Sequence, residues 1–225
     1  MILSVIVPAF NEVSTIATVL QRVDEVDLDM EIIVVDDGST DGTLEQVKAA
    51  GVKNVRVFRH DVNRGKGAAV RTGLAQATGN VVVIQDGDME YDPQDFIRLY
   101  EPIASGETRV VYGFRVFSSQ TLLLRVGNRF VTLLTNILYG VAIRDMETCY
   151  KMWQREVLEE ENLSASGFDI EVELTASFVA AGEHIVQLPI NYQARQAKKL
   201  RWWLDGPVAI LRLFQFRLFR RRLDR

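Results

Sequence analysis

The sequence predicts an α/β fold, built on a mainly parallel sheet with helices on both faces. Short runs rich in β-branched residues alternate with helical patterns through the first 113 residues. Such alternation implies parallel strands joined by right-handed crossovers. The runs are almost continuously apolar, which is typical of strands covered on both faces. A polar loop follows each run, at the sheet edge where ligands of α/β proteins bind.

Four strand–helix units produce this rhythm. The first predicted helix ends near Gln21, and the fourth begins after Pro93. The predicted strands span residues 3–7, 31–35, 55–58 and 81–84.

Beyond Gly113 the rhythm breaks. Residues 122–141 form a long, mostly apolar helical pattern, and a region of mixed pattern follows it. No repeat or low-complexity linker interrupts the chain. We therefore expect one domain over residues 1–199, followed by a basic, aromatic segment over residues 200–225.

The composition is that of an ordinary globular protein, with 225 residues, 48% of them hydrophobic, and a net charge of −4. The single cysteine, Cys149, excludes an intramolecular disulfide framework and a multi-cysteine zinc site. We expect Cys149 to be a small buried apolar residue. The two histidines, His60 and His184, are too few to favour a histidine metal site, and we expect them to be core or surface residues.

The small net charge conceals an asymmetry. From Arg195 to the end there are ten basic and two acidic residues, a charge of +8, so the first 194 residues carry −12. The acidic body argues against nucleic acid as a partner. The basic segment also contains Trp202-Trp203 beside Arg201, a combination suited to a membrane interface.

Membrane contact is expected only at the surface. The first residues lack the basic region and cleavage site of a signal peptide. The longest charge-free apolar run, between Arg129 and Arg144, is shorter than the roughly 18–20 residues of a spanning helix. The segment from Val208 to Phe219 is apolar nearly all round, so it is expected to lie half in protein and half in lipid. The alternatives for it are a packed terminal helix or a homo-oligomer interface.

Two carboxylates in a turn follow the fourth strand. Asp86 and Asp88 flank Gly87, so both side chains can face one cation, and Glu90 can add a third ligand. Mg²⁺ and Mn²⁺ prefer such oxygen ligands and commonly share phosphate oxygens with a substrate. We therefore predict a divalent metal site here.

The loops after the second and third predicted strands each allow a functional and a structural interpretation. Asp37 can accept a hydrogen bond from a base or ribose, or Asp36-Asp37 can simply form a turn before a helix capped by Ser39 or Thr40. Lys66 can meet a phosphate or start a helix. Gly65 and Gly67 complete neither a dinucleotide-binding fingerprint nor a P-loop.

Four motifs follow one another in the order Val7-Pro8-Ala9-Phe10-Asn11-Glu12, Asp36-Asp37-Gly38-Ser39, Asn63-Arg64-Gly65-Lys66-Gly67 and Gln85-Asp86-Gly87-Asp88. In combination they resemble the motifs of the family 2 glycosyltransferases, which have a Rossmann-like GT-A fold. Residues 145–151 and 188–195 resemble the branch of dolichyl- and polyprenyl-phosphate mannose synthases.

The resemblance implies a role for each site residue. Asp86 and Asp88 would hold Mg²⁺ or Mn²⁺ against the donor diphosphate, with Glu90 in place of a more usual Gln, and Gly87 in place of Ala between them. Arg115 and Arg129 would bind the acceptor phosphate and, with Asp88, form the catalytic set. The residues implied to line the base and ribose are Pro8, Phe10, Glu12 and Asp37, and those implied to meet the donor phosphates are Lys66, Arg195 and Lys198.

The implied activity is inverting transfer of a hexose, mannose first, from GDP-mannose or a UDP-hexose to a polyprenyl phosphate. The enzyme would sit peripherally on the cytoplasmic face of a membrane. Phe114 and Leu133 depart from serines that the branch usually has, so transfer to a saccharide or protein hydroxyl stays open. Asp145 or Glu147 would then be the base. A non-catalytic membrane adaptor of the same fold is a further alternative.

Overall fold

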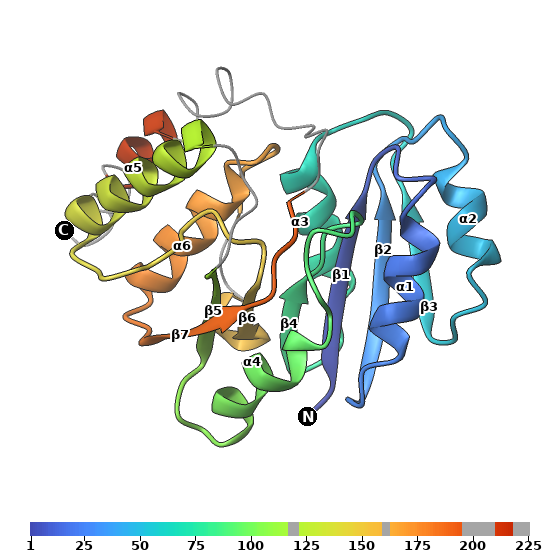
Figure 1. Ribbon diagram of the computed structural model, residues 1–225, viewed down its shortest axis with the longest axis horizontal. Coiled ribbons are helices and arrows are strands. Elements are labelled where there is room, and N and C mark those ends of the chain that lie inside the picture. Colours follow the sequence, from blue (N-terminus) through green and yellow to red (C-terminus); the bar gives the residue numbers. More distant parts are fainter. Residues whose placement is uncertain (117–121, 159–162, 195–209, 218–225) are drawn as a thin grey trace.

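The structure is a computed structural model that describes residues 1–116, 122–158, 163–194 and 210–217. A seven-stranded sheet runs through it in the order β3-β2-β1-β4-β6-β5-β7 (Figure 1). The predicted α/β class is confirmed, and the four expected strands are β1 to β4. The strands are β1 (Leu3–Ala9), β2 (Met30–Asp36), β3 (Val55–Arg59), β4 (Val81–Ile84), β5 (Val110–Arg115), β6 (Lys151–Gln154) and β7 (Ile185–Ile190).

The sheet is parallel apart from one strand. Neighbours pair in parallel from β3 through β2 and β1 to β4, and β5 pairs in parallel with β7. Between these two groups β6 is antiparallel to both β4 and β5. The carboxyl ends of the six parallel strands therefore meet at one edge, and β6 begins at that same edge.

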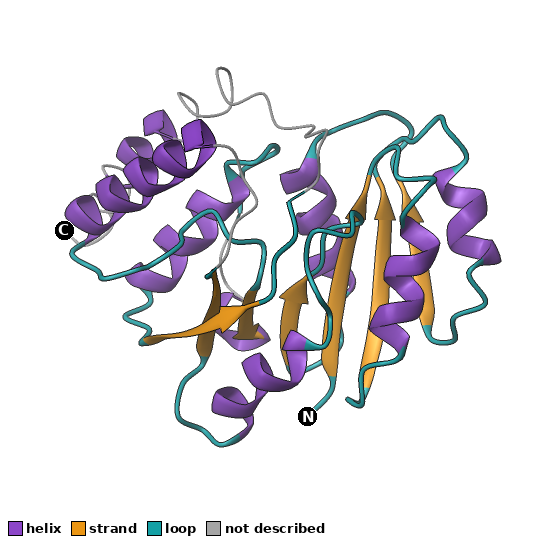
Figure 2. Cartoon of the chain, in the orientation of Figure 1, coloured by secondary structure: helices purple, strands orange, loops and turns teal. Residues whose placement is uncertain are grey.

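Helices cover both faces of the sheet (Figure 2). On β2, Ile33 and Val35 cluster with Ala69 of α3. Val34, which points to the other face, belongs to the main core together with Val19 of α1. The helices are α1 (Ile16–Asp24), α2 (Thr43–Ala49), α3 (Lys66–Gln76), α4 (Asp95–Ala104), α5 (Leu122–Tyr139) and α6 (Ile170–Ala180), with a short 3₁₀ helix at Arg155–Leu158.

Two helices lie side by side at one end of the molecule, α5 and a helix over residues 210–217 (Figure 1). Leu213 is fully buried, and the Tyr139 hydroxyl donates to its carbonyl at 2.9 Å. Arg212 pairs with Asp169, just before α6, at 3.0 Å between Nε and Oδ2. This stretch of the predicted 200–225 segment therefore packs on the domain. In the described parts of the chain, no helix is long and apolar enough to span a bilayer.

The loop after β2 differs from the expected helix start. Helix α2 begins after Gly42, and the carboxylate of Asp41 accepts the Thr43 N–H at 3.0 Å. Ser39 instead accepts the N–H of Asn11 through its hydroxyl at 2.9 Å. The prediction that Ser39 or Thr40 caps the helix was therefore wrong. The side chain of Ser39 joins the loop after β2 to the loop after β1, which draws the two polar loops together.

Candidate active site

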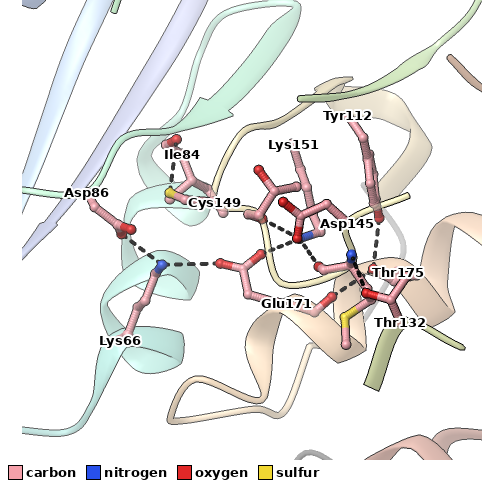
Figure 3. A network of polar contacts seen from close by, with 12 residues as sticks. Lys66, Ile84, Asp86, Tyr112, Thr132, Asp145, Cys149, Lys151, Glu171 and Thr175 are labelled. Atoms are coloured by element: carbon pink, nitrogen blue, oxygen red, sulfur yellow. Dashed lines mark hydrogen bonds and ion pairs between the residues drawn. The ribbon is translucent and has the colours of Figure 1, made fainter. Parts of the chain in front are cut away.

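A row of buried and partly buried charges runs from the end of β4 into the second half of the sheet (Figure 3). The ammonium of Lys66 lies 2.7 Å from Oδ1 of Asp86 and 3.1 Å from Oε1 of Glu171. The other oxygen of Glu171 is 2.6 Å from the ammonium of Lys151. Negative and positive side chains alternate in the order Asp86, Lys66, Glu171 and Lys151. The charges of these four residues therefore cancel.

Lys66 is held in place by its backbone. It is the first residue of α3, and the next two N–H groups donate to a loop, Gly67 to Gly167 at 3.1 Å and Ala68 to Ser166 at 3.2 Å. A Cβ on Gly67 would lie 2.5 Å from the Ala165 carbonyl oxygen, so glycine allows this close approach. The start of α3 is thus occupied by protein carbonyls and offers no P-loop-like cradle. Burial lowers the pKa of the Lys66 ammonium, but the charge of Asp86 opposes this effect. The pKa of Lys66 is therefore above its usual value.

Asp88 lies close to the carboxylates of Asp86, Glu90 and Glu12. Burial, with the neighbouring charges of Asp86 and Glu90 and a smaller effect of Glu12, raises the pKa of Asp88 to about 7. Its Oδ1 accepts the N–H of Glu90 at 3.1 Å, and Glu90 itself accepts the Tyr192 hydroxyl at 2.7 Å. This concentration of negative charge is what a divalent cation would neutralise.

The donor set fits a Mg²⁺ or Mn²⁺ ion shared with a diphosphate. Within the described residues, no three His, Cys, Asp or Glu side chains converge on one point, because Asp86 turns to Lys66 and Glu90 to Tyr192. Mg²⁺ is usually held by one or two carboxylates, with water and substrate phosphates supplying the other ligands. Asp86 and Asp88 meet that requirement, and the Lys66 ammonium stands where positive charge is needed.

Asp37 is committed to the protein's own loops. Its Oδ1 lies 2.6 Å from Nδ1 of His60 and accepts the N–H of Arg64 at 2.9 Å, while Oδ2 accepts the N–H of Gly65 at 2.7 Å. Only 2% of Asp37 is exposed. Asp37 therefore shapes the loop that leads to Lys66, and His60 is a core residue, as expected.

The remaining residues implied for the nucleotide lie around the end of β1. Pro8 and Phe10 are partly exposed, and Glu12 is buried. A Cβ on Gly87 would be 3.5 Å from both the Glu12 Cγ and the Pro8 carbonyl oxygen, which places the Asp86-Gly87-Asp88 turn against this loop. An alanine would fit there at ordinary contact distance. Arg195 and Lys198 lie outside the described residues.

The two predicted acceptor arginines have different environments. Arg115, at the end of β5, makes a bidentate pair with Asp145, both N–O distances being 2.6 Å, and its guanidinium lies 5.1 Å from the Tyr192 ring centre. Arg129 is exposed on α5. The Thr132 hydroxyl, three residues on, accepts the N–H of Met146 at 3.2 Å and so ties α5 to the loop that carries Asp145.

Glu147 lies in the same loop. Burial raises its pKa to about 7, with the carboxylates of Glu171 and Asp145 adding to the effect and Lys151 and Arg115 opposing it. A carboxylate with such a pKa is suited to take up a proton near neutral pH. Asp145, in contrast, is bound on both oxygens by Arg115.

Glu171 and Lys151 are site residues that the sequence motifs do not identify. Both are charged residues inside apolar stretches, Cys-Tyr-Lys-Met-Trp and Asp-Ile-Glu-Val-Glu-Leu. A buried charge must be paired, so a charged residue inside an apolar stretch indicates a buried ion pair. It did not reveal the partners, because these lie far away in the sequence.

A mainly parallel α/β sheet with paired aspartates after β4 and polar loops at one edge defines a GT-A glycosyltransferase. The chain belongs to glycosyl transferase family 2, whose family model matches residues 4–161. The resemblance seen in the motifs is thereby confirmed.

Named relatives extend this result over most of the chain. It is 30% identical over 219 residues to glycosyltransferase AglJ of Haloferax volcanii, covering 94% of this chain and 70% of that protein. It is also 30% identical over 206 residues to the polyprenol monophosphomannose synthase of Mycolicibacterium smegmatis, covering 85% and 77%.

A solved structure with the same fold is glucosyl-3-phosphoglycerate synthase of Mycobacterium tuberculosis. It was crystallised with Mn²⁺, UDP-glucose and phosphoglyceric acid. The TM-score is 0.77 at 25% identity, over 96% of this chain and 79% of that one.

The raised pKa of Asp88 predicts a stability cost that depends on pH. Asp88 is ionised above about pH 4 in the unfolded chain but only above about pH 7 in the fold. Below pH 4 Asp88→Asn should therefore match wild type. Between pH 4 and 7 the free energy of unfolding of Asp88→Asn should increasingly exceed that of wild type. The difference should reach about 1 kcal/mol or more at pH 8 in metal-free buffer. Urea unfolding at several pH values measures this, and an advantage that is the same at every pH would contradict it.

Proposed function

We propose that the chain transfers a hexose, mannose first, from a nucleoside-diphosphate sugar to a polyprenyl phosphate, with inversion and with Mg²⁺ or Mn²⁺. The observation that carries the proposal is the cluster of carboxylates around Asp88, beside Lys66, at the carboxyl edge of a family 2 fold. The polyprenol-phosphate acceptor is suggested by the name of the mycobacterial relative. The donor is GDP-mannose or a UDP-hexose.

In this proposal the aspartates serve the donor and the arginines serve the acceptor. Asp86 and Asp88 hold the cation, which when bound neutralises the diphosphate leaving group. Arg115 and Arg129 bind the acceptor phosphate, with Asp145 orienting the guanidinium of Arg115. A phosphate acceptor is already an anion at neutral pH, so its attack needs no strong base.

An apolar stripe on α5 supports a membrane-bound acceptor. Phe130, Leu133 and Ile137 are 55%, 57% and 70% exposed at helical spacing, and Val126 extends the stripe by one turn. On the neighbouring helix Leu211 and Phe214 are also exposed.

Exposed arginines accompany this stripe, Arg125 and Arg129 on α5. Apolar side chains beside basic ones suit the surface of a bilayer with anionic lipids. We therefore propose a peripheral enzyme on the cytoplasmic face, attached through α5 as well as the C-terminal segment.

The transfer is tested with radiolabelled GDP-mannose, UDP-glucose and UDP-galactose, extracted polyprenyl phosphate and Mn²⁺. A lipid-linked product with one donor is expected, and Asp88→Asn should reduce its formation at least 100-fold. Asp61→Asn, in an exposed loop residue, is the matched control and should retain activity. The absence of lipid-linked product with every common donor would contradict the proposed acceptor.

Membrane attachment is tested by flotation with liposomes that contain anionic phospholipid. Replacing Leu133 and Ile137 by Glu should lower the bound fraction at least tenfold, because charge would enter the lipid-facing stripe. The control is Ile97→Glu, at a residue of α4 that is 46% exposed. Equal binding by all three proteins would remove α5 from the membrane contact.

A second candidate function is transfer to a hydroxyl, with Glu147 as the base. Its pKa of about 7 is the observation that favours it, and the pairing of Asp145 with Arg115 makes Asp145 the weaker candidate. The similar protein from Mycobacterium tuberculosis is named a glucosyl-3-phosphoglycerate synthase and was crystallised with phosphoglyceric acid, which is not a polyprenol.

Glu147→Gln separates the two candidates. Transfer to a hydroxyl should fall about 10²- to 10⁴-fold, because the proton then has no acceptor. Its rate in wild type should rise with pH up to about 7, as Glu147 loses its proton. Transfer to polyprenyl phosphate should change less than tenfold. Assays with phosphoglyceric acid and with polyprenyl phosphate, run on both proteins, make the comparison.

A further inference from the structure

We propose that Lys66 is a resident cation of the metal site, which a divalent ion must displace from Asp86, and that Glu171 is the positioning residue that receives it. This inference rests on the proposed function, since it requires the ion to bind at Asp86 and Asp88. It assigns roles to Lys66 and Glu171 that concern metal exchange, apart from contact with the sugar or the acceptor.

The contacts of Lys66 are unequal. Its ammonium makes an ion pair with Oδ1 of Asp86 at 2.7 Å. With Oε1 of Glu171 it makes an ion pair at 3.1 Å that lacks hydrogen-bond geometry. That oxygen is buried and accepts no hydrogen bond from the part of the chain that the structure describes. A short rotation of Lys66 away from Asp86 would supply one (Figure 3).

Only the side chain of Lys66 is free to make this movement. The first turn of α3 is joined to residues 165–167 by hydrogen bonds from Gly67 and Ala68. Gly67 packs too closely against that loop for α3 to shift toward it. The backbone of Lys66 is therefore fixed, and its ammonium lies between the two carboxylates with 13% of the side chain exposed.

Glu171 is fixed on its other side. Lys151 is fully buried and donates to Glu171 and to the carbonyl oxygens of Met146 and Thr148, at 2.6, 2.8 and 2.5 Å. If Lys66 left the site, Glu171 would keep one cation but lose the other. A buried carboxylate is costly to leave partly uncompensated, which favours retention of Lys66 next to it.

The exchange follows from the competition of two cations for one oxygen. A divalent ion that takes Oδ1 of Asp86 expels the ammonium, and Glu171 offers it a ready acceptor a short distance away. Lys66 should therefore weaken binding of the free ion, and Glu171 should ease it. After exchange the ammonium stays beside the metal site, where it can also neutralise a donor phosphate.

The experiment measures Mn²⁺ binding to the nucleotide-free protein by titration calorimetry, with electron paramagnetic resonance of free Mn²⁺ as a second readout. Lys66→Met should bind Mn²⁺ about threefold to tenfold more tightly than wild type. Glu171→Gln should bind it more weakly by a similar factor, because the ammonium then has only Asp86. The controls are Lys48→Met and Glu45→Gln, both exposed on α2.

The two substitutions should change Mn²⁺ affinity in opposite directions. Damage to the fold would instead weaken Mn²⁺ binding in both variants. Lys66→Gln replaces Lys66→Met if the latter does not fold, as judged by circular dichroism. Unchanged or weaker binding in the Lys66 variant, or tighter binding in Glu171→Gln, would overturn the inference.

Failure of the metal site itself gives a different result. Mn²⁺ binding to wild type that Asp88→Asn does not weaken, or no binding at all, would overturn both the inference and the metal assignment of the proposed function. Binding that requires Asp88 but does not respond to Lys66 would overturn the inference alone.

Discussion

The ion pair between Lys66 and Glu171 joins the two halves of the molecule. Lys66 belongs to the strand–helix units that pack around β1, and Glu171 belongs to α6, which follows the reversed strand β6. The pair forms only because Gly67 lets α3 dock on residues 165–167. Through Asp86 on one side and Lys151 on the other, this contact links the turn after β4 to the start of β6.

The edge of the sheet concentrates negative charge that the fold does not itself neutralise. Asp36 and Asp37 are compensated by Arg59, His60 and backbone N–H groups, so they serve the loops. Within the part of the chain that the structure describes, no basic side chain pairs with Asp88, and burial together with the neighbouring carboxylates raises its pKa. Buried carboxylates placed close together lower the stability of the fold, in keeping with the general conflict between stability and function.

Much of the fold was accessible from the sequence because periodicity and loop chemistry are local properties. Strands β1 to β4, the turn at Asp86 and the buried state of Cys149 all follow from neighbouring residues. The reversed strand β6 and the ion pairs of Glu171 do not, because they depend on distant partners: Val83 pairs with Met152, 69 residues on, and Lys66 with Glu171, 105 residues on. For Asp37 the sequence allowed a ligand or a loop residue, and only its three bonds reveal what it binds within the protein.

The antiparallel direction of β6 has a consequence for how the chain is divided. Because β6 starts where β4 ends, the loop before it delivers Asp145 and Glu147 to the same edge as Asp86. That loop lies outside the strand pairing of β1 to β4. Its length and side chains can therefore change without disturbing the register of the first four strands.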